Sequence, residues 1–306
     1  MGSSTLLLGL DVGGSRTRLR GERGDGNLCV ERDGPGANPN RVGADTTVTR
    51  LTTLVDATLA DLNGIDHLVL AAGVSGAGSP SVQSRLTKAL EAALARPGLR
   101  VDVEVVHDGI IALDAAYDDG SGVIVIAGTG SLVLARTHNG TIARAGGWGP
   151  QLGDDGSGRA LGRAGLRAVA EALDGGRDTG LRDRVFESLD LDDRADLLTT
   201  VHRADFSLAD VAPLVVTAAQ NGDSAASRIL REQVSALARQ VEWLRARGPN
   251  VAPRLTALGG LTTNDHYYRA LRDALRALDS EISIRRLDTP PVLGALRRAR
   301  RRVSNP

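Results

Sequence analysis

The sequence predicts an α/β fold made of two related halves. At 306 residues the chain exceeds a typical single domain, so we expect two domains of ordinary size. Short apolar patterns of strand length alternate with longer helical patterns, which favours a mainly parallel sheet covered by helices. The pattern that opens the chain returns at Gly122, and this internal repeat indicates that the second half follows the plan of the first.

The first half opens with three short strand patterns separated by glycine turns, LLLGLDVGG, RTRLRGER and NLCVER. Patterns joined in this way predict a three-stranded meander. We expect a helix over residues 42–62, a strand at HLVLAAG, a helix over 82–95, a strand at VDVEVV and a short helix at IIALDAAY. The meander is therefore followed by alternating helices and strands.

The second half opens in the same way, with GVIVIAGTGS, LVLART and TIARAGG. The chain is then mostly helical up to Arg247. A strand at LTALGG, a helix from Asp265, a strand at EISIRR and a final helix from Pro291 complete the predicted order.

The boundary between the halves is expected at DDGSG. We place the domains at residues 1–118 and 119–289, with the closing helix, 290–306, packed back on the first domain. The glycine turns at matching places in the two halves are expected to lie across a cleft from each other.

Composition excludes several classes of partner. The 37 basic and 37 acidic residues give a net charge of zero, so neither nucleic acid nor an anionic membrane is an expected partner. The single cysteine, Cys29, excludes a disulfide framework within one chain and favours a reducing cytoplasm. The run LLLGL is too short for a signal peptide, and no stretch approaches the roughly 18 apolar residues of a membrane helix. We therefore expect a cytoplasmic protein that binds a small ligand.

Two familiar phosphate-binding motifs are absent from the sequence. The stretch LGLDVGGSRT lacks the G-x-G-x-x-G of a dinucleotide-binding turn and is followed by a strand pattern instead of a helix. A Walker A loop needs a Gly-Lys pair, whereas the single lysine, Lys88, lies inside the helical pattern SRLTKALEAAL. The arrangement left is a strand-to-strand turn that presents backbone N–H groups and hydroxyls to phosphates.

Both glycine turns have the chemistry for that role, and Asp11 is expected to hold a Mg²⁺ ion through water. In LTALGGLTTN a glycine pair follows an apolar strand and would let the backbone approach an adenine ring. The candidate ATP-binding residues are Asp11, Gly13, Gly14, Ser15 and Thr17 in the first turn, Gly128, Thr129 and Gly130 in the second turn, and the pair Gly259 and Gly260.

The stretch GGWGPQLGDDGSG, residues 146–158, contains six glycines, two adjacent aspartates and one of the two tryptophans. A turn needs one or two glycines and gains nothing from a tryptophan or a carboxylate pair, so the composition indicates a ligand-binding loop. Trp148 is flanked by glycines and is better suited to line a pocket than to fill a core.

Together these motifs resemble the sugar kinase, heat-shock 70 and actin superfamily. DVGGSRT is similar to its first phosphate motif, AGTGS to the second, LGG to the adenosine motif and TPPVLGALRRA to the closing helix. GGWGPQLGDDGSG resembles the GGWG and GDEGS sequence of the N-acetylglucosamine kinase branch of the BadF/BadG/BcrA/BcrD ATPase family. The resemblance covers nearly the whole chain. It implies two actin-like (ribonuclease H-like) domains, ATP and Mg²⁺ as cofactors, and a homodimer.

The resemblance also implies roles for individual residues. Asp108, in VVHDGIIAL, resembles the base that takes the proton from the sugar 6-hydroxyl. Because it lies between a strand and a helix pattern, Asp108 is also expected to cap the N-terminus of that helix. The residues implied to bind the sugar are Asn38, Ser75, Asp108, Ser131, Trp148, Gly149 and Asp154.

The leading interpretation is an ATP-dependent kinase that phosphorylates the 6-hydroxyl of N-acetylglucosamine. Glucosamine and N-acetylmuramic acid are alternative substrates, because one small substituent changes preference by only about 1 to 3 kcal/mol. Three positions depart from the family pattern: His107, Leu132 and Asp155, the last in place of a glutamate.

Two other classes of function are weaker interpretations. An ATPase that activates a CoA dehydratase or reductase shares the family name, but such relatives use several cysteines for an iron–sulfur cluster and Cys29 stands alone. A sugar-sensing regulator carries a DNA-binding motif ahead of the first phosphate motif, where this chain has ten residues. The run RRARRR, residues 297–302, is interpreted as a solvated or dipole-complementing helix end.

Overall fold

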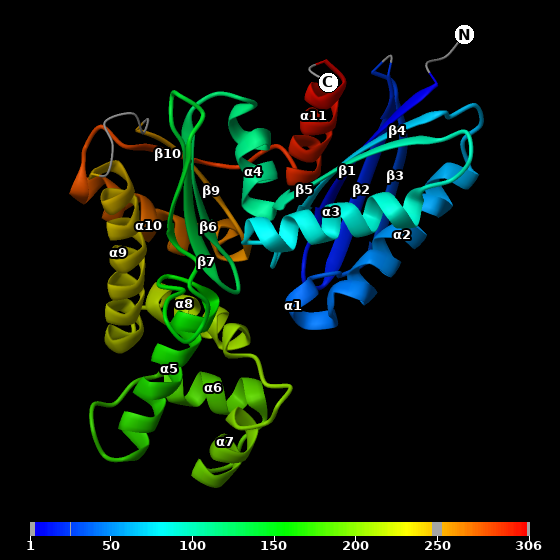
Figure 1. Ribbon diagram of the computed structural model, residues 1–306. Helices are drawn as coiled ribbons and strands as arrows, with labels where there is room; N and C mark the ends of the chain where they lie inside the picture. Colours follow the sequence, from blue (N-terminus) through cyan, green and yellow to red (C-terminus); the bar gives the residue numbers. More distant parts are fainter. Residues whose placement is uncertain (1–3, 25, 247–252, 305–306) are drawn as a thin grey trace. The chain divides into compact units, whose positions relative to one another are not determined.

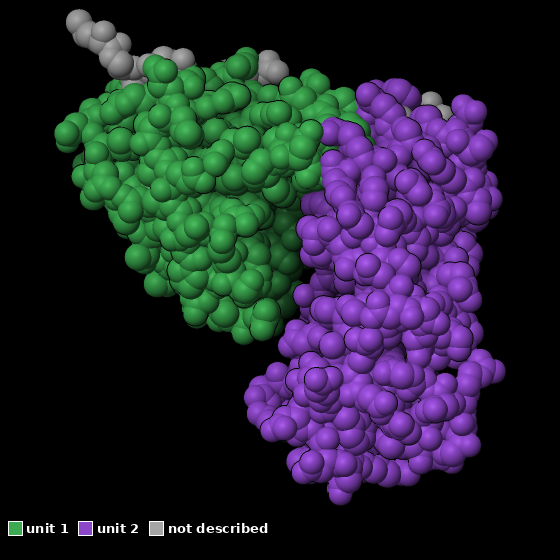
Figure 2. Space-filling view, turned by 180° about the vertical axis from the view of Figure 1, so that it is seen from behind, with its two compact units in different colours: residues 1–120, 287–306 green, residues 121–286 purple. Residues whose placement is uncertain are grey.

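The computed structural model describes residues 4–24, 26–246 and 253–304, which divide into two compact units. Unit 1 comprises the described residues up to Gly120 together with those from Leu287 onward, and unit 2 runs from Ser121 to Arg286 (Figure 2). Each unit contains one five-stranded sheet. Arg247, where we expected the helical region to end, lies outside the described residues.

The sheet of unit 1 has the strand order β3-β2-β1-β4-β5. Strands β1 to β3 are antiparallel neighbours, which confirms the predicted meander, and β4 and β5 run parallel to β1. Their bounds are β1 Thr5–Val12, β2 Arg16–Arg23, β3 Leu28–Pro35, β4 His67–Val74 and β5 Arg100–His107.

Helices cover both faces of this sheet, which explains why β1 is a nearly continuous apolar run. Helices α2 (Ala44–Ala60) and α3 (Pro80–Leu94) share a core with Leu6, Leu8 and Leu10 of β1. Helix α11 (Pro291–Ser304) packs against Leu7 on the opposite face, beside α4 (Asp108–Tyr117; Figure 1). The remaining helix of the unit is α1, a single turn over Pro39–Val42.

The sheet of unit 2 has the order β10-β9-β6-β7-β8. Strands β6 to β8 form the second antiparallel meander, and β9 and β10 continue the sheet in parallel with β6. The strand bounds are β6 Gly122–Ala127, β7 Ser131–Arg136, β8 Ile142–Gly146, β9 Arg254–Leu258 and β10 Ser283–Arg286.

The helices of unit 2 pack around this sheet and around one another in a single apolar core. α10 shows why the pattern is helical: Tyr267, Leu271 and Leu275 recur every four residues and all three are buried. The bounds are α5 Gly158–Leu173, α6 Leu181–Leu189, α7 Arg194–Val201, η1 Leu208–Val211, α8 Ala212–Gln220, α9 Ser224–Ala246, η2 Gly260–Thr263 and α10 Asp265–Leu278.

The two sheets have the same topology, which confirms the internal repeat predicted from the sequence. In each, a three-stranded meander is extended by two parallel strands beside its first strand. In unit 2 the helices α5 to α9 lie between the meander and the first of its two parallel strands, β9. The glycine turns follow the first strand of each meander, at the carboxyl edge where open α/β sheets commonly bind ligands. Among the described residues, none of the helices is long and apolar enough to cross a membrane.

Candidate active site

In unit 1 the first glycine turn that we predict to bind phosphate, called the first phosphate turn below, lies at the carboxyl end of β1. Gly13 N–H donates to the carbonyl of Arg16 (2.9 Å), and Ala37 N–H donates to the carbonyl of Gly13 (3.1 Å). A Cβ atom on Gly36 would overlap the carbonyl of Gly14, so the segment after β3 approaches the turn more closely than other residues permit. Backbone contacts therefore hold the turn at the edge of the sheet.

An arginine that the sequence motifs did not single out lies over this turn. A Cβ atom built on Gly14 would be 3.0 Å from the Nη1 atom of Arg41, on α1. A guanidinium there adds positive charge where we expect phosphate groups. Ser15 is exposed in the turn, whereas Thr17 is buried and its hydroxyl donates to the carbonyl of Pro35 (2.8 Å).

Two predicted sugar-binding residues of unit 1 contact each other. Asn38 Nδ2 donates to the Ser75 hydroxyl (3.3 Å), and Asn38 Oδ1 accepts from Asn40 N–H (2.8 Å) as the N-cap of α1. Ser75 N–H donates to the carbonyl of Val12 at the end of β1 (2.9 Å). The amide and the hydroxyl are thus held beside the strand that carries the phosphate turn.

Asp11 and Asp108 are like charges that interact within unit 1. Burial raises the pKa of Asp11 from its ordinary 3.8 to about 6, with a second contribution from the charge of Asp108. Arg18, with Nη1 3.8 Å from Asp11 Oδ2, and Arg16 oppose this rise in the pKa. The negative charge is therefore only partly compensated by the protein, which is typical of a site that accepts a cation.

The structure corrects the predicted cap of α4. His107 is the N-cap residue, with extended backbone (φ −65°, ψ 142°), and its Nδ1 atom accepts a hydrogen bond from Gly109 N–H (3.0 Å). Asp108 is the first residue of the helix, and its Oδ1 atom accepts from the same N–H group (2.9 Å). Aspartate is the commoner cap, so residue preference alone placed the cap one position too late.

In unit 2 the second phosphate turn, between β6 and β7, is bonded to the start of α5. Gly128 N–H donates to the carbonyl of Gly130 (3.0 Å). Gly158 N–H donates to the carbonyl of Gly128 (2.8 Å), and Arg159 N–H donates to the carbonyl of Thr129 (3.2 Å). Because the loop 146–158 leads directly into α5, the phosphate turn and the loop meet in space.

Ser131 connects the phosphate turn to this loop. Its hydroxyl donates to the carbonyl of Asp155 (2.7 Å), and its N–H donates to Asp154 Oδ1 (3.3 Å). Asp154 is 5% exposed and has φ 67°, a left-handed conformation that aspartate adopts more readily than most residues. Arg159 Nη1 lies 3.7 Å from the other oxygen of that carboxylate. Two of the predicted sugar-binding residues, Ser131 and Asp154, are thus brought together.

Three residues that sequence reasoning missed anchor the loop from distant helices. Gln233 of α9 accepts from Gly156 N–H through Oε1 (3.1 Å), and the hydroxyl of Tyr267, on α10, donates to the Gly156 carbonyl (2.6 Å). Gln240 Nε2 donates to Asp155 Oδ2 (3.0 Å), so the aspartate that replaces the family glutamate reaches its partner on α9. A glutamine or tyrosine on an amphipathic helix carries no signal that would have identified these contacts.

Trp148 lies outside the core, as predicted from its glycine neighbours. It is 67% exposed, and the guanidinium carbon of Arg144 lies 5.5 Å from the centroid of its ring. Gly149 follows with φ 81°. Leu132 is buried, and a Cβ atom on Gly147 would be 2.7 Å from its Cδ1 atom. Leu132, which departs from the family pattern, therefore packs against the start of the loop 146–158.

The glycine pair proposed for adenine binding lies beside the second phosphate turn. A Cβ atom on Gly259, where φ is 107°, would overlap the carbonyl of Ala127. A Cβ atom on Gly128 would be 3.8 Å from Gly260 N, whereas a Cβ atom on Gly260 would meet no other group within 4 Å. Gly259 is required for packing, and Gly260 leaves the backbone accessible.

The site residues lie in a region that matches a known family. Residues 8–296, nearly the whole chain, match the sequence model of the BadF/BadG/BcrA/BcrD ATPase family. This protein is a member of that family. The match includes every residue of the phosphate turns, the glycine pair and the loop 146–158.

Members and relatives of the family are similar over most of their length. The N-acetylmuramic acid/N-acetylglucosamine kinase of Clostridium acetobutylicum is 29% identical over 299 residues, 95% of this chain and 96% of the relative. The N-acetyl-D-glucosamine kinase of Dictyostelium discoideum is 29% identical over 254 residues, 77% of each chain. The crystal structure of a proposed N-acetylglucosamine kinase of Chromobacterium violaceum has a TM-score of 0.74 and 26% identity, covering 95% of this chain and 97% of that one. The predicted actin-like α/β fold is confirmed.

Proposed function

We propose that this protein is an ATP-dependent kinase that transfers the γ-phosphoryl group to the 6-hydroxyl of N-acetylglucosamine, with Asp108 as the general base. The observation that carries the proposal is in unit 2, where Ser131 bonds the phosphate turn directly to the loop that carries Asp154 and Trp148. A kinase needs phosphate-binding and acceptor-binding groups side by side, because phosphoryl transfer depends mainly on position and charge. The family and the names of the two relatives support ATP and an amino sugar as substrates.

Asp108 acts on the acceptor hydroxyl. Its carboxylate accepts the proton of the 6-hydroxyl while that oxygen forms a bond to the γ-phosphorus, and the bond from the γ-phosphorus to the bridging oxygen breaks as ADP leaves. The two hydrogen bonds at Gly109 N–H fix the start of α4, so the carboxylate has a defined direction. No covalent bond to the protein is needed.

Asp11 is the residue proposed to hold Mg²⁺, through water. Its raised pKa reflects a carboxylate that burial and Asp108 both disfavour, and a divalent cation would offset both effects. Among residues 4–24, 26–246 and 253–304, no group of three or more His, Cys, Asp or Glu side chains could hold a metal ion, so water and phosphate oxygens would supply the other ligands. The bound ion supplies positive charge to the phosphate groups.

Each unit has its own set of residues proposed to contact the sugar. Asn38 and Ser75 present an amide and a hydroxyl from unit 1. In unit 2 the carboxylate of Asp154 would accept sugar hydroxyl protons, and the exposed ring of Trp148 would pack against the apolar face of the pyranose. Ser131 and Gly149 complete the proposed set.

A coupled ADP-release assay tests the function and the substrate together. We expect ADP release to depend on N-acetylglucosamine and to be slower with glucose, glucosamine, N-acetylmannosamine and N-acetylmuramic acid. Sugar-independent ADP release would favour an ATPase, and a faster rate with N-acetylmuramic acid would favour the alternative substrate, which also appears in the name of the Clostridium acetobutylicum relative.

Replacement of the base tests the mechanism. Asp108→Asn is expected to abolish sugar phosphorylation while ATP binding stays within a few-fold, since the amide cannot accept the proton. Asp119→Asn is a matched control, because Asp119 is an exposed aspartate just after the same helix. Retained turnover in Asp108→Asn would remove this residue as the base.

A further inference from the structure

Arginines of the run in α11 pair with buried carboxylates of unit 1. Arg301 Nη2 lies 2.9 Å from Asp114 Oδ1, and Arg298 Nε lies 3.5 Å from Asp114 Oδ2. Arg300 pairs with the buried Glu22 of β2. The interpretation as a solvated helix end therefore does not hold for Arg298 and Arg301, whereas Arg300 reaches Glu22 from a side chain that is 51% exposed.

Asp114 is a fully buried carboxylate on α4. Burying an unpaired carboxylate is strongly unfavourable, so its two arginine partners bind α4 to α11. The backbone is held as well, because Arg297 Nη1 donates to the carbonyls of Asp114 (2.8 Å) and Ala115 (3.1 Å). A further side-chain contact follows the helix, where Arg301 Nη1 donates to Asp118 Oδ1 (2.9 Å). α11 thus holds the last turn of α4 through side chain and backbone together.

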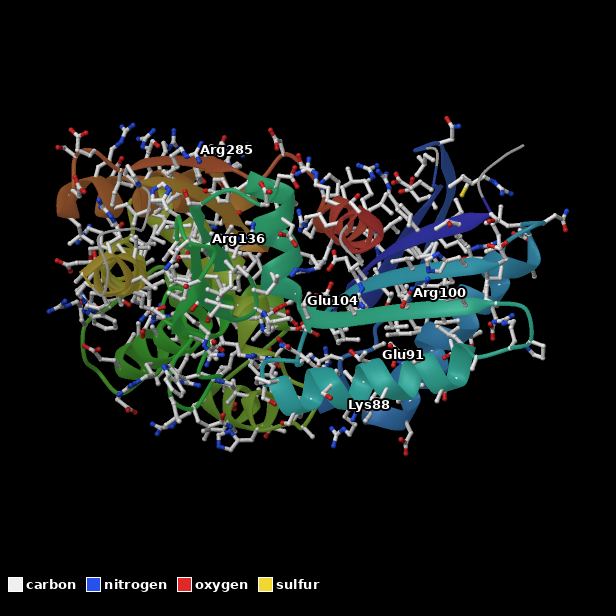
Figure 3. The ribbon with its side chains drawn as sticks, turned by 45° about the horizontal axis from the view of Figure 1, so that its top comes forward. Lys88, Glu91, Arg100, Glu104, Arg136 and Arg285 are labelled. Atoms are coloured by element: carbon white, nitrogen blue, oxygen red, sulfur yellow. The ribbon has the colours of Figure 1, made fainter. Side chains whose placement is uncertain are left out.

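Arg298, one of the two arginines that face Asp114, also pairs with a residue of a third element. Arg298 Nη2 lies 3.7 Å from Glu104 Oε1, and Arg302 Nη1 lies 4.0 Å from Glu104 Oε2. Glu104 projects from β5 near α11 (Figure 3). Asp114, Asp118 and Glu104 therefore share the guanidinium groups of α11.

Backbone packing places α11 against both elements that carry a candidate catalytic carboxylate. A Cβ atom on Gly294 of α11 would overlap the carbonyl of Ile111, on α4. A Cβ atom on Gly9 would overlap the backbone of α11, and Gly9 lies two residues before Asp11 on β1. The same helix is thus the common support for Asp11 and for the helix that begins at Asp108.

We propose that Asp114, Arg298 and Arg301 form a positioning clamp that sets the placement of Asp108 through α4. The inference rests on the proposed function, because it assigns the clamp to the base of that reaction. Asp114 lies six residues after Asp108 on a helix of ten residues, about 9 Å along the axis. A tilt at one end of so short a helix moves the other end, and a displacement of about 1 Å can lower a rate by about a hundredfold.

The matched pair Arg301→Ala and Arg300→Ala separates positioning from stability. Each variant removes an α11 arginine from a buried carboxylate. Arg301 pairs with Asp114 on α4, whereas Arg300 pairs with Glu22 on β2. At a temperature where both are folded, we expect Arg301→Ala to lower kcat by about tenfold to a hundredfold, with KM for ATP and sugar changed by less than about twofold. Arg300→Ala is expected to lower Tm at least as much as Arg301→Ala does, while its kcat stays within about twofold of the wild-type value. Arg301→Lys, which keeps the charge, is expected to recover much of kcat.

Hydrogen exchange gives a readout that does not depend on activity. Amides of residues 109–112 are expected to exchange faster in Arg301→Ala than in wild type, and at the wild-type rate in Arg300→Ala. If Arg301→Ala does not fold, Arg301→Lys and Arg298→Lys are compared with Arg300→Lys by the same measurements. Equal losses of kcat in the two members of a pair, or faster exchange with unchanged kcat, would overturn the proposal. A wild-type protein without sugar-dependent ADP release would overturn the proposed function instead, while hydrogen exchange would still test the clamp.

Discussion

Replacing Asp11 by asparagine should make the free protein more stable at pH 8 while abolishing its use of Mg-ATP. The pKa of Asp11 is raised from 3.8 to about 6, which corresponds to about 3 kcal/mol of destabilisation of the ionised form at about 1.4 kcal/mol per unit of pKa. Burial is the main cause and Asp108 the second. Asparagine has nearly the same shape and no charge, so it removes this cost.

The sign of the pH dependence follows from proton binding. Between pH 3.8 and about 6 the folded protein binds more protons at Asp11 than the unfolded chain does, so stability falls as the pH rises through this window. Below the window both states are protonated and the cost disappears. The advantage of Asp11→Asn should therefore be about 3 kcal/mol at pH 8 and close to zero at pH 3.5.

Thermal unfolding without nucleotide measures this difference. For a unit of this size about 3 kcal/mol corresponds to a rise in Tm of roughly 6 to 12 °C. Asp108→Asn should give a smaller rise because it removes only the second cause of the raised pKa. Mg-ATP should stabilise the wild type and not Asp11→Asn. An unchanged or lower Tm for Asp11→Asn at pH 8, or the same gain at pH 3.5, would refute the reasoning.

Three further substitutions test the remaining parts of the site. Trp148→Ala should raise KM for the sugar far more than KM for ATP. Equal increases in the two KM values in steady-state kinetics would mean that the ring does not pack against the sugar. Arg41→Ala should lower kcat by about tenfold or more through loss of positive charge over the phosphate turn, with partial recovery in Arg41→Lys; unchanged kcat would exclude contact with the transferred group. Tyr267→Phe should destabilise unit 2 by about 1 to 3 kcal/mol, because the Gly156 carbonyl loses its donor, and a denaturation midpoint equal to that of wild type would contradict this.

Local sequence patterns predicted those features of the candidate site that depend on neighbouring residues. Asp11, the two glycine turns and the glycine pair were identifiable because each follows a strand pattern and has turn chemistry of its own. Trp148 was predicted outside the core because glycines on both sides offer it little to pack against. Such features are visible in a few adjacent residues.

Features that depend on distant partners could not be predicted. The N-cap of α4 is His107 because the helix already begins at Asp108, directly after β5 ends at His107. Gln240 and Tyr267 hold the loop from helices that lie more than eighty residues later in the chain. Arg41 is exposed on a single helical turn, and only the folded chain places it over Gly14.

By itself the sequence determined the repeated meanders, the glycine turn after the first strand of each meander and the glycine-rich loop 146–158, because periodicity and turn chemistry are local properties. Only the tertiary structure decided which charges meet. The run RRARRR reads as an exposed basic end, yet three of its arginines lie against Asp114 and Glu22, far away in sequence. A buried carboxylate is stable only when a cation lies beside it, and the packing of α11 against β1 and α4 determines which arginine lies there.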